Sequence, residues 1–187
     1  MSRVEGEIVE EELNAEDEAR RRLALAQIRQ YPDVALKIAS RPVEEFDDEL
    51  RDLVERMKRL MHDAHGLGLA ANQVGVIRRL FVFTPSKDVV AAVVNPEIVE
   101  RSDETDVADE GCLSIQGITV PVERSLEVTI AGKDENGGDV RYELDGYTAR
   151  CVQHETDHLD GILMIDRTTP DARREALGVL RPRIVLT

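Results

Sequence analysis

The sequence is poor in several residue types, and each shortage excludes a class of protein. It has no tryptophan, 3% aromatic residues and only two cysteines, Cys112 and Cys151, among 187 residues. In a reducing compartment such a pair is more often a ligand, a nucleophile or a core residue than a disulfide. No apolar run approaches the ~20 residues that cross a bilayer, and no signal peptide opens the chain. We therefore expect a cytoplasmic protein that does not bind membranes.

Positive charge is also scarce. The chain carries 24 Lys and Arg against 38 Asp and Glu, which gives a formal net charge of -14. A broad phosphate-binding surface needs clustered basic residues, so a nucleic-acid substrate is not expected. Acidic residues dominate positions 1–19, which we expect to be a disordered N-terminal extension. Residues 20–187 contain enough apolar sequence to form a single domain.

Hydrophobic periodicity divides the chain into helices, then strands, then helices again. Apolar residues recur at intervals of three and four in the helical segments and alternate in short β-rich runs between them. This order predicts an α+β fold, with antiparallel sheets packed around a central helix. The expected segments are helices at 19–30, 44–64 and 171–177, strands at 79–84, 89–94, 97–99, 118–122, 126–131 and 139–144, an acidic loop at 103–109 and a hairpin turn at 134–138.

The central helix carries the sequence His154-Glu155-Thr156-Asp157-His158. At ~3.6 residues per turn, His154 and His158 lie on one face about one turn apart, so both imidazoles can bind one metal ion. Glu155 lies beside that ion. This is the spacing of the zinc hydrolases, in which the glutamate handles the proton of the metal's water ligand. The alternative is an amphipathic helix with two surface histidines.

A catalytic site of this kind needs a third protein ligand and one open position. Met164 stands where the corresponding zinc peptidases have their last histidine, which argues against that class. Cys151 is on the same helix, about 10 Å along the axis from His158, too far to share the ion. Cys112 follows a glycine in a separate segment and can approach from the side. We therefore expect a Cys, His, His site that also binds one water.

Residues 66–73 combine two glycines and two alanines and end in Gln73, whose amide side chain can both donate and accept hydrogen bonds. Small residues let another backbone come close, so this segment can receive an extended peptide and aim Gln73 into the site. A plain turn between a helix and a strand is the alternative. His62 and His65 lie at the end of the preceding helix, where imidazoles suit the helix dipole, and we do not expect them to bind metal.

Three segments together, residues 66–73, 110–114 and 153–161, resemble the signature motifs of the peptide deformylases. These enzymes remove the formyl group from the N-terminal formylmethionine of new bacterial proteins. The resemblance extends from about Leu25 to Asp166 and implies a single catalytic domain. It also implies that the metal ligands are Cys112, His154 and His158, that Glu155 is the acid and base, and that Gln73 and the backbone NH of Leu113 bind the oxyanion.

The resemblance further implies a slot for the methionine side chain and a backbone that binds the peptide. Glu110 is expected to pair with Arg124 and so to fix the cysteine loop, although both could be solvated charges. Asp157 is expected either to support the metal ligands or to be solvated. The substrate-binding residues expected from the resemblance are Gly66, Leu67, Gly68, Glu110, Gly111, Tyr147, Arg150 and Cys151, with Arg150 contributing its aliphatic stem.

The cofactor that the resemblance implies is one divalent metal ion. A thiolate ligand suits Fe²⁺ as well as Zn²⁺, and the resemblance favours Fe²⁺ in the cell, whereas Zn²⁺, Ni²⁺ or Co²⁺ can occupy the purified protein. The expected partners are N-formylmethionyl nascent peptides and the ribosome near its peptide exit, and a monomer is expected. The basic tail for docking comprises Arg173, Arg174, Arg181 and Arg183. A metallopeptidase, or a metal-binding or redox-sensing domain without enzyme activity, remains the alternative.

Overall fold

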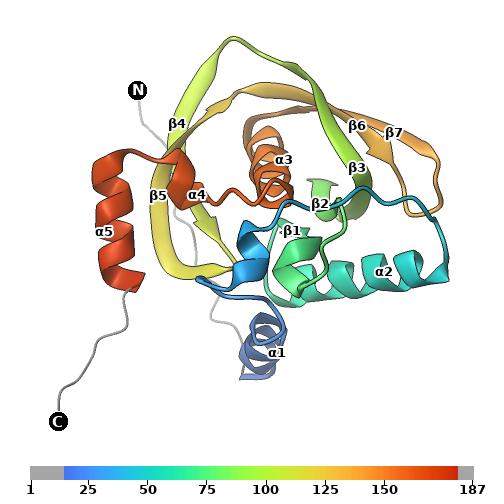
Figure 1. Cartoon of the computed structure of the whole chain (residues 1–187), viewed down its shortest axis with the longest axis horizontal. Coiled ribbons are helices and arrows are strands. Elements are labelled where there is room, and N and C mark those ends of the chain that lie inside the picture. Colours follow the sequence, from blue (N-terminus) through green and yellow to red (C-terminus); the bar gives the residue numbers. More distant parts are fainter. Residues whose placement is uncertain (1–14, 181–187) are drawn as a thin grey trace, which may run out of the picture.

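The structure is a computed structural model that describes residues 15–180. Its helices and strands surround one central helix, α3, as Figure 1 shows. The helical elements are α1 (Ala15–Leu25), η1 (Val34–Lys37), α2 (Asp48–Asp63), η2 (Ala71–Val74), α3 (Gly146–Leu159), α4 (Met164–Arg167) and α5 (Pro170–Leu180). The strands are β1 (Gly68–Ala70), β2 (Leu80–Ser86), β3 (Val89–Arg101), β4 (Thr105–Cys112), β5 (Ile115–Ser125), β6 (Glu127–Lys133) and β7 (Asp139–Asp145).

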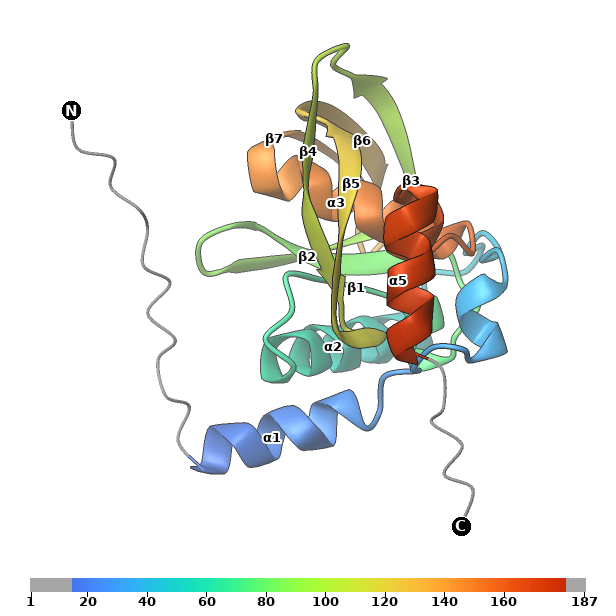
Figure 2. The same cartoon turned by 90° about the vertical axis from the view of Figure 1, so that its left-hand side faces the viewer.

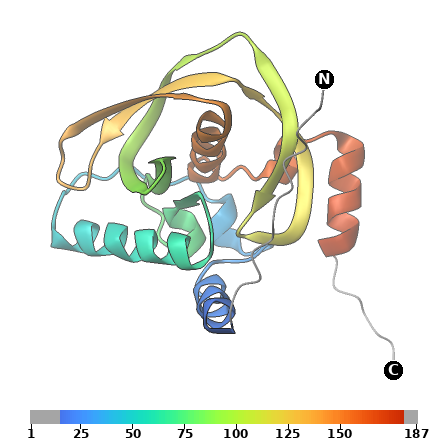
Figure 3. The ribbon, with the colours of Figure 1, turned by 180° about the vertical axis from the view of Figure 1, so that it is seen from behind.

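The strands form two antiparallel sheets. Five strands follow the order β1-β2-β3-β6-β7, and β4 pairs only with β5 in a long hairpin. In the view from behind, α3 lies between the two sheets and α2 lies below it (Figure 3). The predicted α+β class, with antiparallel sheets around a central helix, is confirmed.

The core consists of three apolar clusters that hold α3 and the hairpin in place. The apolar stripe predicted for residues 44–64 forms α2, whose buried face packs on β1 and β2. The Asp47 carboxylate accepts a hydrogen bond of 2.9 Å from the Leu50 NH and starts that helix. A second cluster lies between α3 and the five-stranded sheet, and a third joins the hairpin to α4 and α5. Within residues 15–180 no helix is long and apolar enough to cross a membrane.

Two predicted segments differ from the structure. Helix α1 begins at Ala15, so residues 15–19 are helical and not part of a disordered extension, while residues 1–14 lie outside the described part. Residues 103–109 are not an acidic loop, because β4 begins at Thr105 and pairs with β5. Backbone pairing needs no apolar side chain on the exposed face, so an acidic sequence can form this strand.

Helix α1 lies under α2, and α5 lies along the outer side of the β4-β5 hairpin (Figure 2). Ala24 of α1 is buried in the same cluster as α2. Helices that are far apart in the sequence therefore lie around the start of β1 and the β4-β5 hairpin: α1 and α2 on one side and α5 on the other.

Candidate metal centre and pocket

Helix α3 brings the two histidines together at the centre of the molecule. The ring centroids of His154 and His158 are 4.9 Å apart, and both side chains are buried. Helix α3 packs against β1 and β2 on one side and β5 on another, which orients the histidine face toward the hairpin. The helix ends before Gly161, whose φ of +71° favours glycine.

Cys112 completes the cluster from the end of β4. Its Sγ lies 3.2 Å from His158 Nε2, and the ligand atoms of Cys112, His154 and His158 all lie within 4.8 Å of one another. Within residues 15–180 this is the one such group of Cys, His, Asp or Glu side chains that could hold a metal, and Cys151 is not part of it. One thiolate and two imidazoles make the donor set of a catalytic metal site with an open position.

Glu110 fixes the orientation of His154. Its Oε2 lies 2.9 Å from His154 Nδ1, so the carboxylate accepts that hydrogen and leaves Nε2 free to bind a metal. Burial acts to lower the pKa of His154, but hydrogen bonds to Cys112 and Glu110 raise it well above its usual value. Burial and the nearby His154 lower the pKa of His158 well below its usual value. The thiolate and the two imidazoles form a donor set that fits a divalent cation, and the Glu110 carboxylate behind His154 supports it.

A buried ion network supports this arrangement, and the expected pair of Glu110 and Arg124 is confirmed. Arg124 Nε donates to Glu110 Oε1 at 2.8 Å, and Arg124 Nη1 donates to Asp157 Oδ2 at 2.6 Å. Burial acts to raise the pKa of Glu110, but hydrogen bonds from His154 and Arg124 hold it at about 2. Asp157 is thus not a solvated charge. Arg167 also donates to its carboxylate, at 2.6 Å.

Glu155 lies beside the cluster, next to β1. Its side chain is buried, and its Oε2 has no hydrogen-bond partner within the described residues. Burial raises the pKa of Glu155 to about 7, and the charge of Glu110 adds to this while His154 opposes it. A Cβ at Gly68 would lie 2.5 Å from Glu155 Oε1, so only glycine fits here. A carboxyl of this kind can exchange protons near neutral pH.

Gln73 lies close to Cys112, and Leu113 follows the cysteine in the chain. Gln73 Oε1 accepts from the Ala70 NH at 2.8 Å, and its Nε2 donates to Ser114 Oγ at 3.0 Å. The same Nε2 is 3.8 Å from Cys112 Sγ, so a rigidly held amide donor faces the cluster. Within residues 15–180 the Leu113 NH donates no hydrogen bond, so this donor is available.

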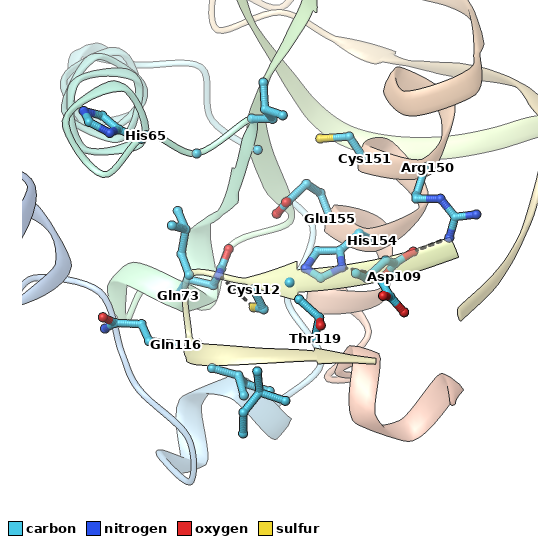
Figure 4. Close-up of a pocket in the computed structure, with 18 of the residues that line it drawn as sticks. His65, Gln73, Asp109, Cys112, Gln116, Thr119, Arg150, Cys151, His154 and Glu155 are labelled. Atoms are coloured by element: carbon cyan, nitrogen blue, oxygen red, sulfur yellow. Dashed lines mark hydrogen bonds and ion pairs between the residues drawn. The ribbon is translucent and has the colours of Figure 1, made fainter. Parts of the chain in front are cut away.

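All the expected substrate-binding residues line one cavity of about 370 Å³ (Figure 4). Arg150 lines the cavity. Its guanidinium group donates hydrogen bonds to Glu110 at 3.0 Å and to the Val122 carbonyl at 2.8 Å. Cys151 lies in the wall, where burial raises the pKa of its thiol well above the usual value. Tyr147 is 65% exposed at the mouth. The lining also includes residues that the motifs did not indicate: Arg21, Leu25, His65, Asp109, Ile115, Gln116, Gly117, Ile118 and Thr119.

Two further supporting residues were missed by the sequence reasoning. Asn72 Nδ2 donates to the His158 carbonyl, and Arg167 holds Asp157. The position of Asn72 next to Gln73 was a usable signal, since a buried motif rarely contains an amide without a partner. Arg167 follows α3 after a turn, and nothing in the sequence around it indicates which acid it binds.

Two histidines on a central helix and a cysteine at the end of a strand, with a buried carboxyl beside them and a cavity open to solvent, are the features of a metal-dependent hydrolase. Comparison with known proteins identifies the family within that class. The family model for polypeptide deformylase matches residues 25–174. The chain belongs to this family, which depends on metal, and it removes the N-formyl group from nascent peptides. The family match argues against both alternative functions, a metallopeptidase and a metal-binding or redox-sensing domain without enzyme activity.

Relatives and solved structures agree on this assignment. The peptide deformylase of Thermotoga sp. (strain RQ2) is 47% identical over 78% of this chain and 88% of its own length. Peptide deformylase 1 of Corynebacterium glutamicum is 41% identical over 85% of this chain and 96% of its own. The crystal structure of the Thermotoga maritima enzyme matches with a TM-score of 0.73 and 45% identity, over 76% of this chain and 97% of that one. The Synechococcus elongatus enzyme in complex with actinonin matches with a TM-score of 0.78 and 37% identity, over 82% of this chain and 86% of that one.

Proposed function

We propose that Cys112, His154 and His158 hold one divalent cation, Fe²⁺ in the cell and Zn²⁺, Ni²⁺ or Co²⁺ in some preparations. The thiolate among the three ligands supports this, because sulfur suits Fe²⁺ and Zn²⁺ better than Mg²⁺ or Ca²⁺. When bound, the cation supplies Lewis-acid chemistry that polarises the formyl carbonyl and lowers the pKa of water. Iron and the thiolate are both sensitive to oxidation, so anaerobic purification should preserve activity.

Glu155 moves the proton in this proposal. It takes a proton from the water that attacks the formyl carbon, and it gives a proton to the nitrogen as the carbon–nitrogen bond breaks. The products are formate and a free N-terminal amine. The raised pKa of Glu155, about 7, supports the role because the carboxyl can be both base and acid at neutral pH.

Gln73 and the backbone NH of Leu113 stabilise the negative charge that develops on the formyl oxygen. Donors fixed in place before the reaction stabilise the transition state more than the substrate. The Gln73 amide satisfies this condition because Ala70 and Ser114 hold it from two sides.

The substrate backbone adds to the free edge of β1, which is the outermost strand of its sheet. Gly66, Leu67 and Gly68 bind it on one side, and Gly111 binds it on the hairpin side. The formyl group lies near Gly68, because this residue touches Glu155. The methionine side chain enters the slot formed by Tyr147, Arg150 and Cys151, while Glu110 keeps Arg150 in place.

The cellular setting of the enzyme is also a proposal. We propose a cytoplasmic monomer that works near the peptide exit of the ribosome and docks through its C-terminal basic residues. Arg173 and Arg174 are exposed on α5, whereas Arg181 and Arg183 lie outside the described residues. Because Ala176 of α5 is buried, the test is deletion of residues 181–187 together with Arg173→Gln and Arg174→Gln. Unchanged co-sedimentation with ribosomes would refute the docking, and Arg20→Gln with Arg22→Gln is the control.

The observation that carries the proposed chemistry is the unpartnered Glu155 carboxyl oxygen in the same cavity as the ligand cluster. The test measures formate released from formyl-Met-Ala-Ser by anaerobically purified protein, together with its metal content. Activity should follow the metal and disappear with a chelator. Cleavage of an N-terminally blocked peptide at an internal bond, without formate, would contradict the proposal.

A further inference from the structure

The outer end of the pocket is built partly by α1, most of which precedes the family match at residue 25. Arg21 and Leu25 of this helix line the cavity together with His65. Helix α1 packs against α2, and His65 follows the end of α2, so these residues share one end of the cavity. Figure 4 shows His65 and Gln116 on one side of the cavity and Asp109 and Arg150 on the other.

Arg21 differs from Arg150, the other arginine of the cavity, because it has no ion-pair partner within residues 15–180. Glu110 and Arg150 bind each other, and Glu155 is buried next to the metal ligands. Arg21 is exposed, and no ion pair or hydrogen bond of its side chain is recorded among residues 15–180. The carboxylates that line the cavity, Asp109, Glu110 and Glu155, come from β4 and α3 and not from α1 or α2. Within residues 15–180, a guanidinium without an ion pair therefore lies at this end of the cavity, and the carboxylates that line the cavity come from other elements.

The path of the substrate leads to this residue. A peptide that adds to the edge of β1, with its formyl group at Gly68, runs past Leu67 and Gly66 toward the turn at the end of α2, where His65 lies. At ~3.3 Å per residue, three residues of an extended chain span about 10 Å, so the third substrate residue extends toward this turn. Arg21 lines the same end of the cavity.

We propose that Arg21 selects formylated peptides that carry a carboxylate on the third residue. This inference rests on the proposed function, and it adds to that function a preference created by the N-terminal helix. A guanidinium pairs well with a carboxylate and disfavours a lysine at the same point. The pair would be partly exposed to solvent, so we expect a preference for Asp over Lys of about two- to fivefold, reduced by salt.

The experiment compares kcat/KM for formyl-Met-Ala-Asp amide, formyl-Met-Ala-Lys amide and formyl-Met-Ala-Ser amide, with the metal-loaded full chain at low ionic strength. C-terminal amides remove the free carboxylate. The wild-type enzyme should favour Asp over Lys, Arg21→Gln should abolish this ratio, and Arg21→Glu should reverse it. Arg22→Glu is the matched control, because Arg22 is exposed on the same helix and does not line the cavity.

Two results would overturn the inference. One is an equal Asp-to-Lys ratio of kcat/KM in wild type and Arg21→Glu. The other is the same reversal of that ratio in Arg22→Glu, which would show only a general electrostatic effect of charge on α1. Thermal unfolding of each variant checks that the helix is retained. The serine peptide separates the two proposals. No formate from it would reject the proposed function, whereas formate without an Asp-to-Lys difference would reject the role of Arg21 alone.

Discussion

The two ends of the pocket differ in how their charged side chains are held. At the deep end Glu110 accepts hydrogen bonds from Arg124, Arg150 and His154, and every member of this network is buried. At the outer end Arg21 and His65 have no ion-pair partner within the described residues. Buried charges need partners because desolvation is costly, whereas exposed charges do not.

This difference separates two tasks. The deep end must hold ligands and a proton carrier in fixed positions, so its residues are constrained by one another. The outer end only biases which peptide enters, and it can change without harm to the chemistry. Substitutions should therefore have large effects at the deep end and small effects elsewhere.

Glu155→Gln is the most severe test of the deep end. The amide keeps the shape of the side chain but cannot carry the proton, so turnover should fall by about 10²- to 10⁴-fold. Bound metal should remain near the wild-type amount, because Glu155 is not one of the three clustered ligands. Formate release and metal analysis measure both. Glu143→Gln, at an exposed position on β7, is the control and should retain full turnover.

Arg124→Met tests how much the buried ion network contributes to the free energy of unfolding. It leaves Glu110 and Asp157 buried without their shared partner, and loss of one member of a buried pair costs about 3–5 kcal/mol. Arg141→Met is the matched control on β7, where the pair with Glu100 is exposed, and it should cost less than about 1 kcal/mol. Urea unfolding measures both free energies. Equal losses would show that burial does not set the strength of these ion pairs.

The deep end could be predicted from the sequence and the outer end could not, for a physical reason. The spacing of His154 and His158 is set by a single helix, and the apolar stripe of α2 is local in the same way. Cys112 was identified because its segment is separate and because Cys151 is too far along the helix. By contrast, strand β4 depends on its pairing with β5, which an acidic sequence does not reveal. The role of Arg21 depends on where α1 packs, and local sequence contains no such information.

Gly68→Ala tests the boundary between the two ends. The added Cβ would lie 2.5 Å from Glu155 Oε1, so the carboxyl must move from its position beside the cluster. Small displacements of catalytic groups cost about 10- to 100-fold in rate, and we expect a fall of this size in kcat/KM. Gly178→Ala in α5 meets no atom within 4 Å and should leave the rate unchanged. An unchanged rate in Gly68→Ala would mean that the position of Glu155 is less constrained than the contact implies.

Asp166→Asn gives the smallest expected effect, and it concerns the immediate neighbour of Arg167. Arg167 binds the buried Asp157, but Asp166 pairs with the partly exposed Lys37 and Arg173. Burial acts to raise the pKa of Asp166, yet the hydrogen bonds from Lys37 and from the Leu163 NH lower it below its usual value of 3.8. A lowered pKa in the folded state means that the ionised form stabilises the fold above about pH 4, and that this contribution is lost as pH falls through the lowered pKa.

At pH 7 the substitution should therefore reduce the free energy of unfolding by about 0.5–1 kcal/mol, and the difference from wild type should shrink toward zero in strong acid. Urea unfolding at a series of pH values measures it. Asp139→Asn, which removes a carboxylate that is 89% exposed and pairs with Lys133, should show a smaller change. If Asp166→Asn reduced the free energy of unfolding as much as Arg124→Met does, a partly solvated ion pair would have the strength of a buried one. That result would contradict the distinction between the buried network and the exposed pairs.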